Sequence, residues 1–303
     1  MKRTKKKAPR KVDAILTGDW HLREDVPECR TDDFITAQWN KVKEVRELQQ
    51  KYNCPVYHSG DLFHHWKTSP ALLSKCLTEL PEQFYTVYGN HDVPQHNVNL
   101  SYKTGMNTLY VAGKIHLLSD GNWNQAPSQN SGIILTSGEI KRKIYVWHVY
   151  TYTGKAPFPG AEKNNDGHTL LDKYPQFDLI LTGDNHIPFI CKNNTGSLLI
   201  NAGSLTRQTA SQIDHTPAVY LYNAETNTVR AHYLKINPKA ATRVHIDIKE
   251  ERETRLSAFV ERLGEHWNED LDFESNVRIM AKQENISQQI MSICEKALDD
   301  ETN

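Results

Sequence analysis

Short apolar runs that end at polar clusters recur along the first two-thirds of the chain. Each run holds three to five residues, many of them β-branched or aromatic, which is typical of strands buried inside a sheet. The runs cover residues 12–16, 55–57, 84–88, 144–147 and 177–181. Helical periodicity between the first three predicts helices at 33–52 and 70–80, the second capped by Ser69. This alternation of strand and helix predicts an α/β fold with a mainly parallel, doubly wound sheet.

The pattern changes after residue 197. Residues 198–200 are predicted to form a strand. Residues 218–222 and 229–234 alternate with a period of two around a polar turn, which predicts a hairpin. We expect these strands to form a second, more antiparallel sheet packed on the first.

A domain boundary is predicted at residues 238–242. Beyond it, the pattern predicts a strand, a helix, a second strand and an amphipathic helix, at 244–248, 252–267, 277–281 and 286–298. The chain is therefore expected to consist of a basic flexible tail (1–11), a main domain (12–237) and a small C-terminal α/β unit (240–303).

Composition and charge predict an intracellular globular protein. The formal net charge of the 303 residues is −1, so any contact with nucleic acid depends on local patches. The basic tail is one such patch, either as a solvated segment or as an arm that binds phosphates. No apolar run approaches the roughly 20 residues that span a bilayer. The basic tail is not followed by an apolar core, so it is not expected to be a secretory signal. Five scattered cysteines without a CxxC pair indicate a reducing compartment, so we expect a cytoplasmic protein with no membrane partner.

Each of the five predicted strands leads into an aspartate, asparagine or histidine. Because the carboxyl ends of parallel strands meet at one edge of a sheet, these side chains are expected to gather there. Carboxylate, amide and imidazole ligands together suit manganese, iron or zinc better than magnesium or calcium. Seven ligands are too many for one metal with an open position, and they suit two metals that share a carboxylate. The seven are Asp19, His21, Asp61, Asn90, His148, Asp184 and His186.

A two-metal centre of this kind suits the hydrolysis of phosphodiesters. Two cations neutralise the phosphate oxygens and lower the pKa of a bound water. The leaving alkoxide needs a proton or a positive group, and His91, beside Asn90, is the candidate for that task. Asp92 is expected to orient His91.

Residues next to the ligands are candidates for contacts with the substrate. Arg23 and Lys67 directly follow metal motifs and are expected to contact the phosphate backbone. His65 and His96 lie close to motif residues, which suggests that they support a ligand or contact a phosphate. Tyr150 and Tyr152 follow His148 and are candidates for stacking on a base.

The order of the motifs resembles that of the calcineurin-like metallophosphoesterase superfamily, which is DxH, GD, GNH(D/E), a lone His and GHxH. The resemblance extends over residues 12–205. It implies a four-layer α/β/β/α sandwich with two divalent metals at the strand ends, Mn²⁺ first, with Mg²⁺, Fe²⁺ and Zn²⁺ as alternatives. The matching segments are Asp19–His21, Gly60–Asp61, Gly89–Asp92, His148 and Gly183–His186.

A narrower resemblance is to the SbcD-like DNA repair exonucleases. Residues 60–64 read GDLFH, residues 19–22 read DWHL and residues 202–204 read AGS, and all three are similar to segments of that family. The resemblance implies that His64 positions the phosphate. It also implies DNA as substrate, an SMC-like ATPase as partner, a homodimer, and a shortened DNA-capping domain at 240–303.

The same resemblance implies how the ligands are divided between the metals. One metal takes Asp19, His21, Asp61 and His186. The other takes Asp61, which bridges, together with Asn90, His148 and residue 184. One position departs from the pattern, because the first histidine of GHxH is Asp184 here. An added carboxylate is expected to favour manganese and to weaken a preference for zinc.

Three functions remain open from the sequence. The first is a metal-dependent DNA exo- or endonuclease in recombination or repair. The second is a phosphodiesterase or phosphatase that acts on a small nucleotide or a phosphoprotein. The third is a catalytically silent subunit that binds DNA or an ATPase, for which Asp184 is the only support.

Overall fold

The computed structural model describes residues 11–123, 125–265, 275–276, 278–279 and 282. The chain forms two compact units, Met1–Thr242 and Arg243–Asn303. The first unit contains two β-sheets and every residue that the sequence singles out for the site.

The first sheet has six strands in the order β11-β10-β1-β2-β3-β4. Its parallel part consists of β1 (Ala14–Thr17), β2 (Val56–His58), β3 (Phe84–Thr86) and β4 (His116–Leu117). β10 (Ala218–Asn223) pairs antiparallel with β1, and β11 (Thr228–Tyr233) pairs antiparallel with β10.

The second sheet has five strands in the order β5-β6-β7-β9-β8. The central strands β6 (Ile140–Trp147), β7 (Leu179–Thr182) and β9 (Leu198–Asn201) are parallel. β5 (Ile133–Ser137) and β8 (Phe189–Lys192) pair antiparallel at the two edges.

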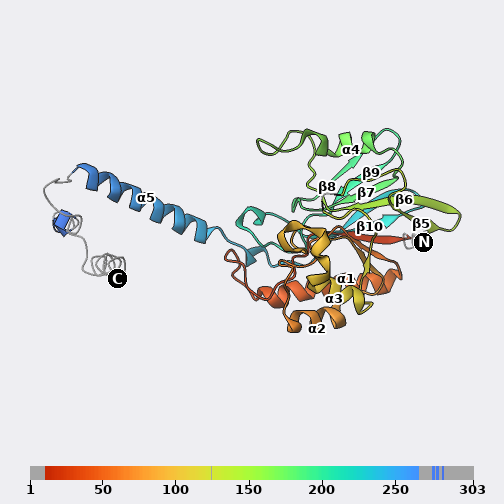
Figure 1. Cartoon of the computed structure of the whole chain (residues 1–303), viewed down its shortest axis with the longest axis horizontal. Coiled ribbons are helices and arrows are strands. Elements are labelled where there is room, and N and C mark those ends of the chain that lie inside the picture. The colour runs from red at the N-terminus through yellow and green to blue at the C-terminus, as the bar shows by residue number, and fades with distance from the viewer. Residues whose placement is uncertain (1–10, 124, 266–274, 277, 280–281, 283–303) are drawn as a thin grey trace, which may run out of the picture. The chain divides into compact units, whose positions relative to one another are not determined.

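The sheets pack face to face, and helices cover their outer faces (Figure 1). α1 (Phe34–Tyr52), α2 (Pro70–Glu79) and α3 (Gly105–Val111) cover the first sheet, and α4 (Gly167–Lys173) covers the second. Alternation along β1 shows how one strand serves two cores: Ile15 packs toward the helices, whereas Ala14 and Leu16 pack between the sheets. The expected four-layer α/β/β/α fold is confirmed. Short 3₁₀ helices lie at Pro94–His96, Val98–Lys103, Lys163–Asn165, Ala210–Gln212 and Pro238–Ala240.

Local signals predicted the first two helices well. α1 begins after Asp33, whose carboxylate accepts a hydrogen bond from the backbone N–H of Thr36. α2 begins after Ser69, whose hydroxyl accepts from the N–H of Leu72. Both caps satisfy N–H groups that the first helical turn leaves without a partner.

The division of strands between the sheets differs from the expectation. The predicted hairpin exists as β10 and β11, but it extends the first sheet beside β1 instead of building the second. β6 and β7, expected beside β1 to β3, form the centre of the second sheet together with β9. All of these strands are short and apolar, so their composition does not tell which sheet they join.

The second unit begins with a single helix, α5 (Val244–Glu265). The predicted strand at 244–248 is therefore wrong. The helix predicted at 252–267 begins earlier, at Val244. Val244 and Ile248 are 56% and 60% exposed, and ion pairs Lys249–Glu253 and Glu251–Arg255 support the helix at a spacing of four.

The remaining C-terminal expectations fall mostly outside the described residues. Residues 278 and 279 are helical, which contradicts the predicted strand at 277–281. The predicted helix at 286–298 and residues 1–10 of the basic tail lie outside the described part. Among the helices of the described part, none is both long and apolar enough to cross a membrane. Cys29, Cys54, Cys76 and Cys191 are free and buried.

Candidate metal centre

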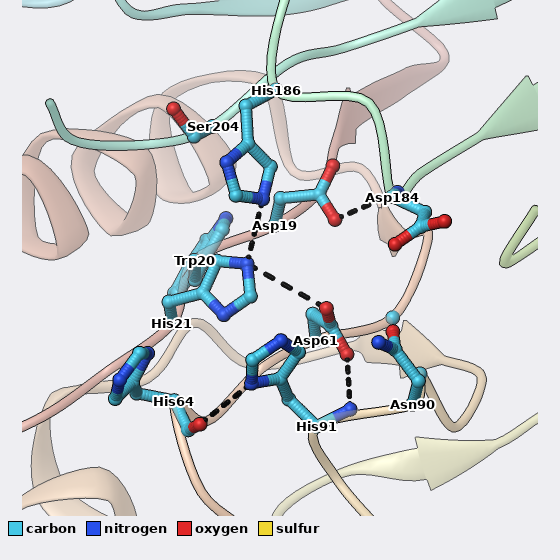
Figure 2. Close-up of polar contacts among 12 residues, drawn as sticks. Asp19, Trp20, His21, Asp61, His64, Asn90, His91, Asp184, His186 and Ser204 are labelled. Atoms are coloured by element: carbon cyan, nitrogen blue, oxygen red, sulfur yellow. Dashed lines mark hydrogen bonds and ion pairs between the residues drawn. The ribbon is translucent and has the colours of Figure 1, made fainter. Parts of the chain in front are cut away.

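The predicted ligands reach one place from the ends of five strands, and both sheets contribute. Asp19 and His21 follow β1, Asp61 follows β2 and Asn90 follows β3. From the second sheet, His148 follows β6, and Asp184 and His186 follow β7. The loops are tied together, because His21 N donates to Asp61 O at 2.9 Å and Asp19 N donates to Gly60 O at 3.2 Å. Figure 2 shows the side chains converging from both sheets.

The ligand atoms form two overlapping groups that share Asp19, and Asp61 lies between the histidines of the two groups. Asp19, His21 and His186 place potential ligand atoms within 4.8 Å of one another, and so do Asp19, Asp61 and His148. Asp61 Oδ2 lies 3.6 Å from His21 Nε2 and 3.5 Å from His148 Nε2. This central position suits a carboxylate shared by two cations.

Hydrogen bonding in the centre shows that the residues fit a metal. His148 Nδ1 lies 2.7 Å from the carbonyl oxygen of Ser59, which can only accept, so Nδ1 carries the proton and Nε2 presents a lone pair. That lone pair faces Asn90 Oδ1, another acceptor, at 2.9 Å. Asp19 Oδ2 and Asp61 Oδ2 are buried with no hydrogen-bond partner. Buried acceptors without donors are costly, and divalent cations would satisfy them.

Burial sets the electrostatics of the centre. It raises the pKa of Asp19 and of Asp61 well above the usual range, and neighbouring carboxylates add to the effect. It also lowers the pKa of His21 far below the usual range, that of His148 to about 3 and that of His186 to about 4. The histidines are thus neutral, which is the form that ligates metals, and the positive charge of a cation would favour the ionised carboxylates.

The backbone is strained where it presents the ligands. Asp19, His21, Asp61 and Asp184 all adopt positive φ, at 49°, 45°, 56° and 69°. Such conformations are uncommon for residues other than glycine and cluster at functional sites. Gly89 allows a close approach, because a Cβ there would lie 2.0 Å from Asp61 Oδ1.

Replacing Gly89 by alanine is therefore expected to disrupt the centre. The added methyl group forces Asp61 to move. We therefore expect the free energy of unfolding to fall by about 1–3 kcal/mol and the metal affinity to fall as well. Gly138→Ala is the matched control, since its Cβ would meet no atom within 4 Å and only its φ of 62° is unfavourable. The control should lose some stability and bind metal like the wild type. Calorimetry with and without Mn²⁺ checks both, and equal metal affinity in the two variants would contradict this role of Gly89.

His91 is fixed by His64 rather than by Asp92. His91 Nδ1 lies 2.8 Å from the backbone carbonyl oxygen of His64, which can only accept, so Nδ1 carries a proton. Nε2 is then free to interact with a substrate. The Asp92 carboxylate instead accepts from the backbone N–H groups of Leu62, Phe63 and Gly89 at 3.0–3.2 Å. The expectation that Asp92 orients His91 directly is corrected: Asp92 joins the loop after β2 to the turn after β3.

The side chain of His64 lies beside His91 at the rim. Their rings stack with centroids 5.6 Å apart, and His21, His64 and His91 form a third group with ligand atoms within 4.8 Å of one another. Burial, and then the nearby charge of Arg23, lower the pKa of His64 to about 4. A neutral His64 can donate one hydrogen bond to an anion without adding charge.

Asp184 lies farther from the centre than the other predicted ligands. Its Oδ1 is 4.0 Å from His148 Nε2, its side chain is 22% exposed, and it belongs to none of the three close groups of described residues. Its backbone N–H donates to Asp19 Oδ1 at 3.0 Å, so the residue also positions a ligand through its main chain.

Asp184→His is expected to raise the activity supported by zinc relative to that supported by manganese, because an imidazole replaces a harder oxygen ligand. Asp184→Asn keeps an oxygen donor and should not raise this ratio. Rates with each metal, measured on the same phosphodiester, check the prediction. Loss of all metal binding in Asp184→His would show that the carboxylate serves another purpose.

Of the four predicted substrate contacts, Arg23 and His96 act on residues of the site. Arg23 forms an ion pair with Asp25, and its charge acts on His64. His96 is exposed and, with His91, opposes the rise in the pKa of Asp184 that burial causes. His65 and Lys67 are exposed and joined by a hydrogen bond from Lys67 N to His65 Nδ1 at 3.1 Å.

Two cavities flank the centre and meet at Tyr150. One, of about 390 Å³, is lined by Trp123, Trp147, His148 and Phe158 among others. The other, of about 700 Å³, includes Asp184, His186, Ile187 and Tyr233 in its walls. Tyr152 is buried, so of the two predicted stacking residues only Tyr150 is placed to meet a ligand.

Sequence reasoning missed the two tryptophans of the first cavity. The Trp123 ring lies 5.9 Å from that of His148, and no motif surrounds it. Trp147 is 6% exposed, and its indole N–H has no acceptor. The position of Trp147 directly before the lone His148 is the one signal that the sequence offers.

A four-layer sandwich with buried aspartates and histidines at its strand ends defines a metal-dependent phosphoesterase. The chain belongs to the calcineurin-like phosphoesterase family, which matches residues 13–188. Membership implies metal-dependent hydrolysis of phosphoesters, and the close groups of histidine and aspartate support divalent metal ions as cofactors.

Similar solved structures share little sequence with this chain. Among curated proteins, none matches the chain. An archaeal phosphodiesterase structure is 15% identical, with 73% of this chain and 99% of that chain covered and a TM-score of 0.41. A metallophosphoesterase from Sphaerobacter thermophilus is 13% identical, with 74% and 89% covered and a TM-score of 0.36. Vacuolar protein sorting 29 from Cryptosporidium parvum is 16% identical, with 75% and 100% covered and a TM-score of 0.35.

Proposed function

We propose that the chain is a DNA nuclease, which hydrolyses phosphodiester bonds with two divalent cations, Mn²⁺ foremost. The observation that carries this proposal is the set of buried acceptors around Asp61 that lack donors. Cations bound by Asp19, His21, Asp61, Asn90, His148 and His186 would supply the charge that neutralises a phosphodiester and activates water. Asp184 would add a harder ligand at the rim, which favours manganese.

His91 and His64 have distinct tasks in this proposal. The Nδ1–H of His91 donates to the backbone carbonyl of His64. Its Nε2 is therefore the atom that delivers a proton to the leaving oxygen. His64 stacks beside it and contacts a phosphate oxygen. Arg23, which lies near enough to lower the pKa of His64, adds positive charge on the same side.

DNA is supported by the aromatic cavity beside His148. Stacking of a base on an aromatic ring contributes about 1–3 kcal/mol and tolerates any base. Tyr150 and Phe158 lie with ring centroids 5.5 Å apart at this cavity. The GDLFH segment and its resemblance to the SbcD-like exonucleases point to the same substrate.

A second candidate is a phosphodiesterase that acts on a small nucleotide. The observation that favours it is the size of the aromatic cavity, since about 390 Å³ is in the range of small-molecule sites. The chemistry of the metal centre would be the same, and only the length of the substrate would differ.

Purified protein with Mn²⁺, offered linear duplex DNA, single-stranded DNA, bis-p-nitrophenyl phosphate and p-nitrophenyl phosphate, separates these functions. The nuclease proposal expects degradation of DNA and of the small diester, with little action on the monoester. Cleavage of the small diester while both DNA substrates survive would favour the second candidate. Inertness toward every substrate, with metal bound, would support a silent subunit.

The resemblance also leads us to propose an SMC-like ATPase partner and a homodimer. The scattered cysteines without a CxxC pair lead us to propose a cytoplasmic location. Light scattering of the purified chain tests the dimer, and affinity capture with the matching ATPase tests the partner. Cell fractionation tests the location.

A further inference from the structure

A third cavity, of about 410 Å³, lies away from the metal centre between α1 and the segment that follows β11. None of the predicted metal ligands lines it. Five basic and three acidic side chains line it. Two of the basic residues, Lys41 and Arg207, are buried. The two residues are 166 positions apart in the sequence, so the fold alone brings them together.

Lys41 and Arg207 are buried cations without a carboxylate partner. Lys41 is 6% exposed, and within the described part its ammonium has one acceptor, the backbone carbonyl of Lys235, at 3.0 Å. Arg207 is 3% exposed and donates to the backbone carbonyls of Ile213, Asn237 and Pro238. No ion pair joins either one to a described carboxylate.

Two of the three acidic side chains of the cavity have other partners. Asp32 accepts from Arg30 Nε at 2.9 Å and from Arg30 Nη2 at 2.7 Å. Glu44 lies 3.0 Å from His232 Nε2 and accepts from the N–H of Lys235 at 3.3 Å. The third, Glu47, is exposed at the rim. Asp32 acts on both cations through space, and Glu44 acts on Lys41, but no described carboxylate forms an ion pair with either one. Lys41 therefore keeps hydrogen-bond donors for a ligand.

Burial, and then the charges of Arg30 and Arg207, lower the pKa of Lys41 to about 8. Lys41 still carries its charge at neutral pH, in a place where a charge without a counter-ion is costly. A methionine would fill the same space without that cost, which argues that the ammonium serves an anion.

We propose that this cavity binds a small phosphate-bearing anion, either inorganic phosphate or a phosphate monoester, through the ammonium of Lys41. Two of the three Lys41 ammonium donors are uncommitted within the described part, and Lys41 is one of the residues that line the cavity. The five basic and three acidic side chains of the lining leave a formal excess of two positive charges, which a dianion matches, and charge-assisted hydrogen bonds hold it. The site is separate from the metal centre and does not depend on the proposed nuclease activity.

Isothermal titration of the EDTA-treated full chain tests the proposal, because removal of metal prevents phosphate from binding at the metal centre. Inorganic phosphate and dAMP are titrated separately, so that the two sources of the anion are distinguished. Lys41→Met is expected to weaken binding at least about tenfold. Lys43→Met, on the exposed rim of the same cavity, should stay within about twofold of the wild type. Absence of binding to the wild type, or equal binding by Lys41→Met, would overturn the proposal.

A second measurement needs no variant. Amine-reactive labelling of the wild-type chain, read by mass spectrometry, reports on Lys41 and Lys43 in the same sample. Phosphate should slow the labelling of Lys41 at least about fivefold, as expected for an ammonium that holds an anion, and leave Lys43 unchanged. Labelling of Lys41 at the same rate with and without phosphate would refute the site even if Lys41→Met does not fold.

Discussion

Asp61→Asn is expected to lower phosphodiester hydrolysis by at least about a thousandfold, or about 4 kcal/mol in the barrier. The carboxylate lies between the two groups of ligands, with Oδ2 3.6 Å from His21 and 3.5 Å from His148. Asparagine keeps the shape and removes the charge that both cations would share. Its amide N–H₂ would also bring a donor where the neighbouring histidines offer ligand atoms.

Metal content and rate, measured on the same preparation, check this prediction. Inductively coupled plasma mass spectrometry after desalting should find less metal in Asp61→Asn than in the wild type. Asp172→Asn is the control, since Asp172 is exposed on α4 and touches no ligand. An Asp61→Asn variant that kept the metal content and rate of the wild type would remove the basis for a bridging role.

His91→Ala is expected to keep its metal and to lose about 10²–10⁴ in turnover of DNA. The loss should be much smaller for bis-p-nitrophenyl phosphate, because p-nitrophenolate leaves without help from an acid. This contrast separates a proton donor from a residue that merely supports the fold, which would affect both substrates alike.

The ring of His91 is held at 2.8 Å from the carbonyl of His64, so its removal should leave the ligands themselves in place. Its backbone N–H, which donates to Asp61 Oδ1 at 2.9 Å, is retained in the variant. His168→Ala, at an exposed position on α4, controls for the loss of a histidine. Equal losses on both substrates would argue against proton transfer by His91.

Much of this fold follows from local sequence. Ser69 marked where α2 begins, and Asp33, expected as the first residue of its helix, caps the first turn of α1. The assignment of β6, β7 and β10 to sheets depends on pairings between distant segments, which short apolar runs do not encode. The period-two run at 244–248 resembled a strand, but no described strand lies there to pair with it, and the segment is helical.

In the candidate site, too, local sequence predicted some features, whereas others depend on contacts between distant segments. The predicted ligands were recognisable because each follows a strand, and the structure brings Asp19, His21, Asp61, His148 and His186 into close groups, with Asn90 beside His148. The task of Asp92 was not recognisable, since its partners are three backbone N–H groups. Trp123 reaches His148 through a loop without a motif, and Lys41 meets Arg207 only in three dimensions.

Titration of metal-free protein with Mn²⁺, while the hydrolysis of bis-p-nitrophenyl phosphate is followed, tests the central claim most directly. The two ligand groups that share Asp19, with Asp61 between His21 and His148, predict two ions bound per chain and hydrolysis that rises from the background to full rate as they bind. Full hydrolysis by the metal-free protein, or full activity with no detectable ion bound, would contradict a metal-dependent phosphoesterase centre at Asp61.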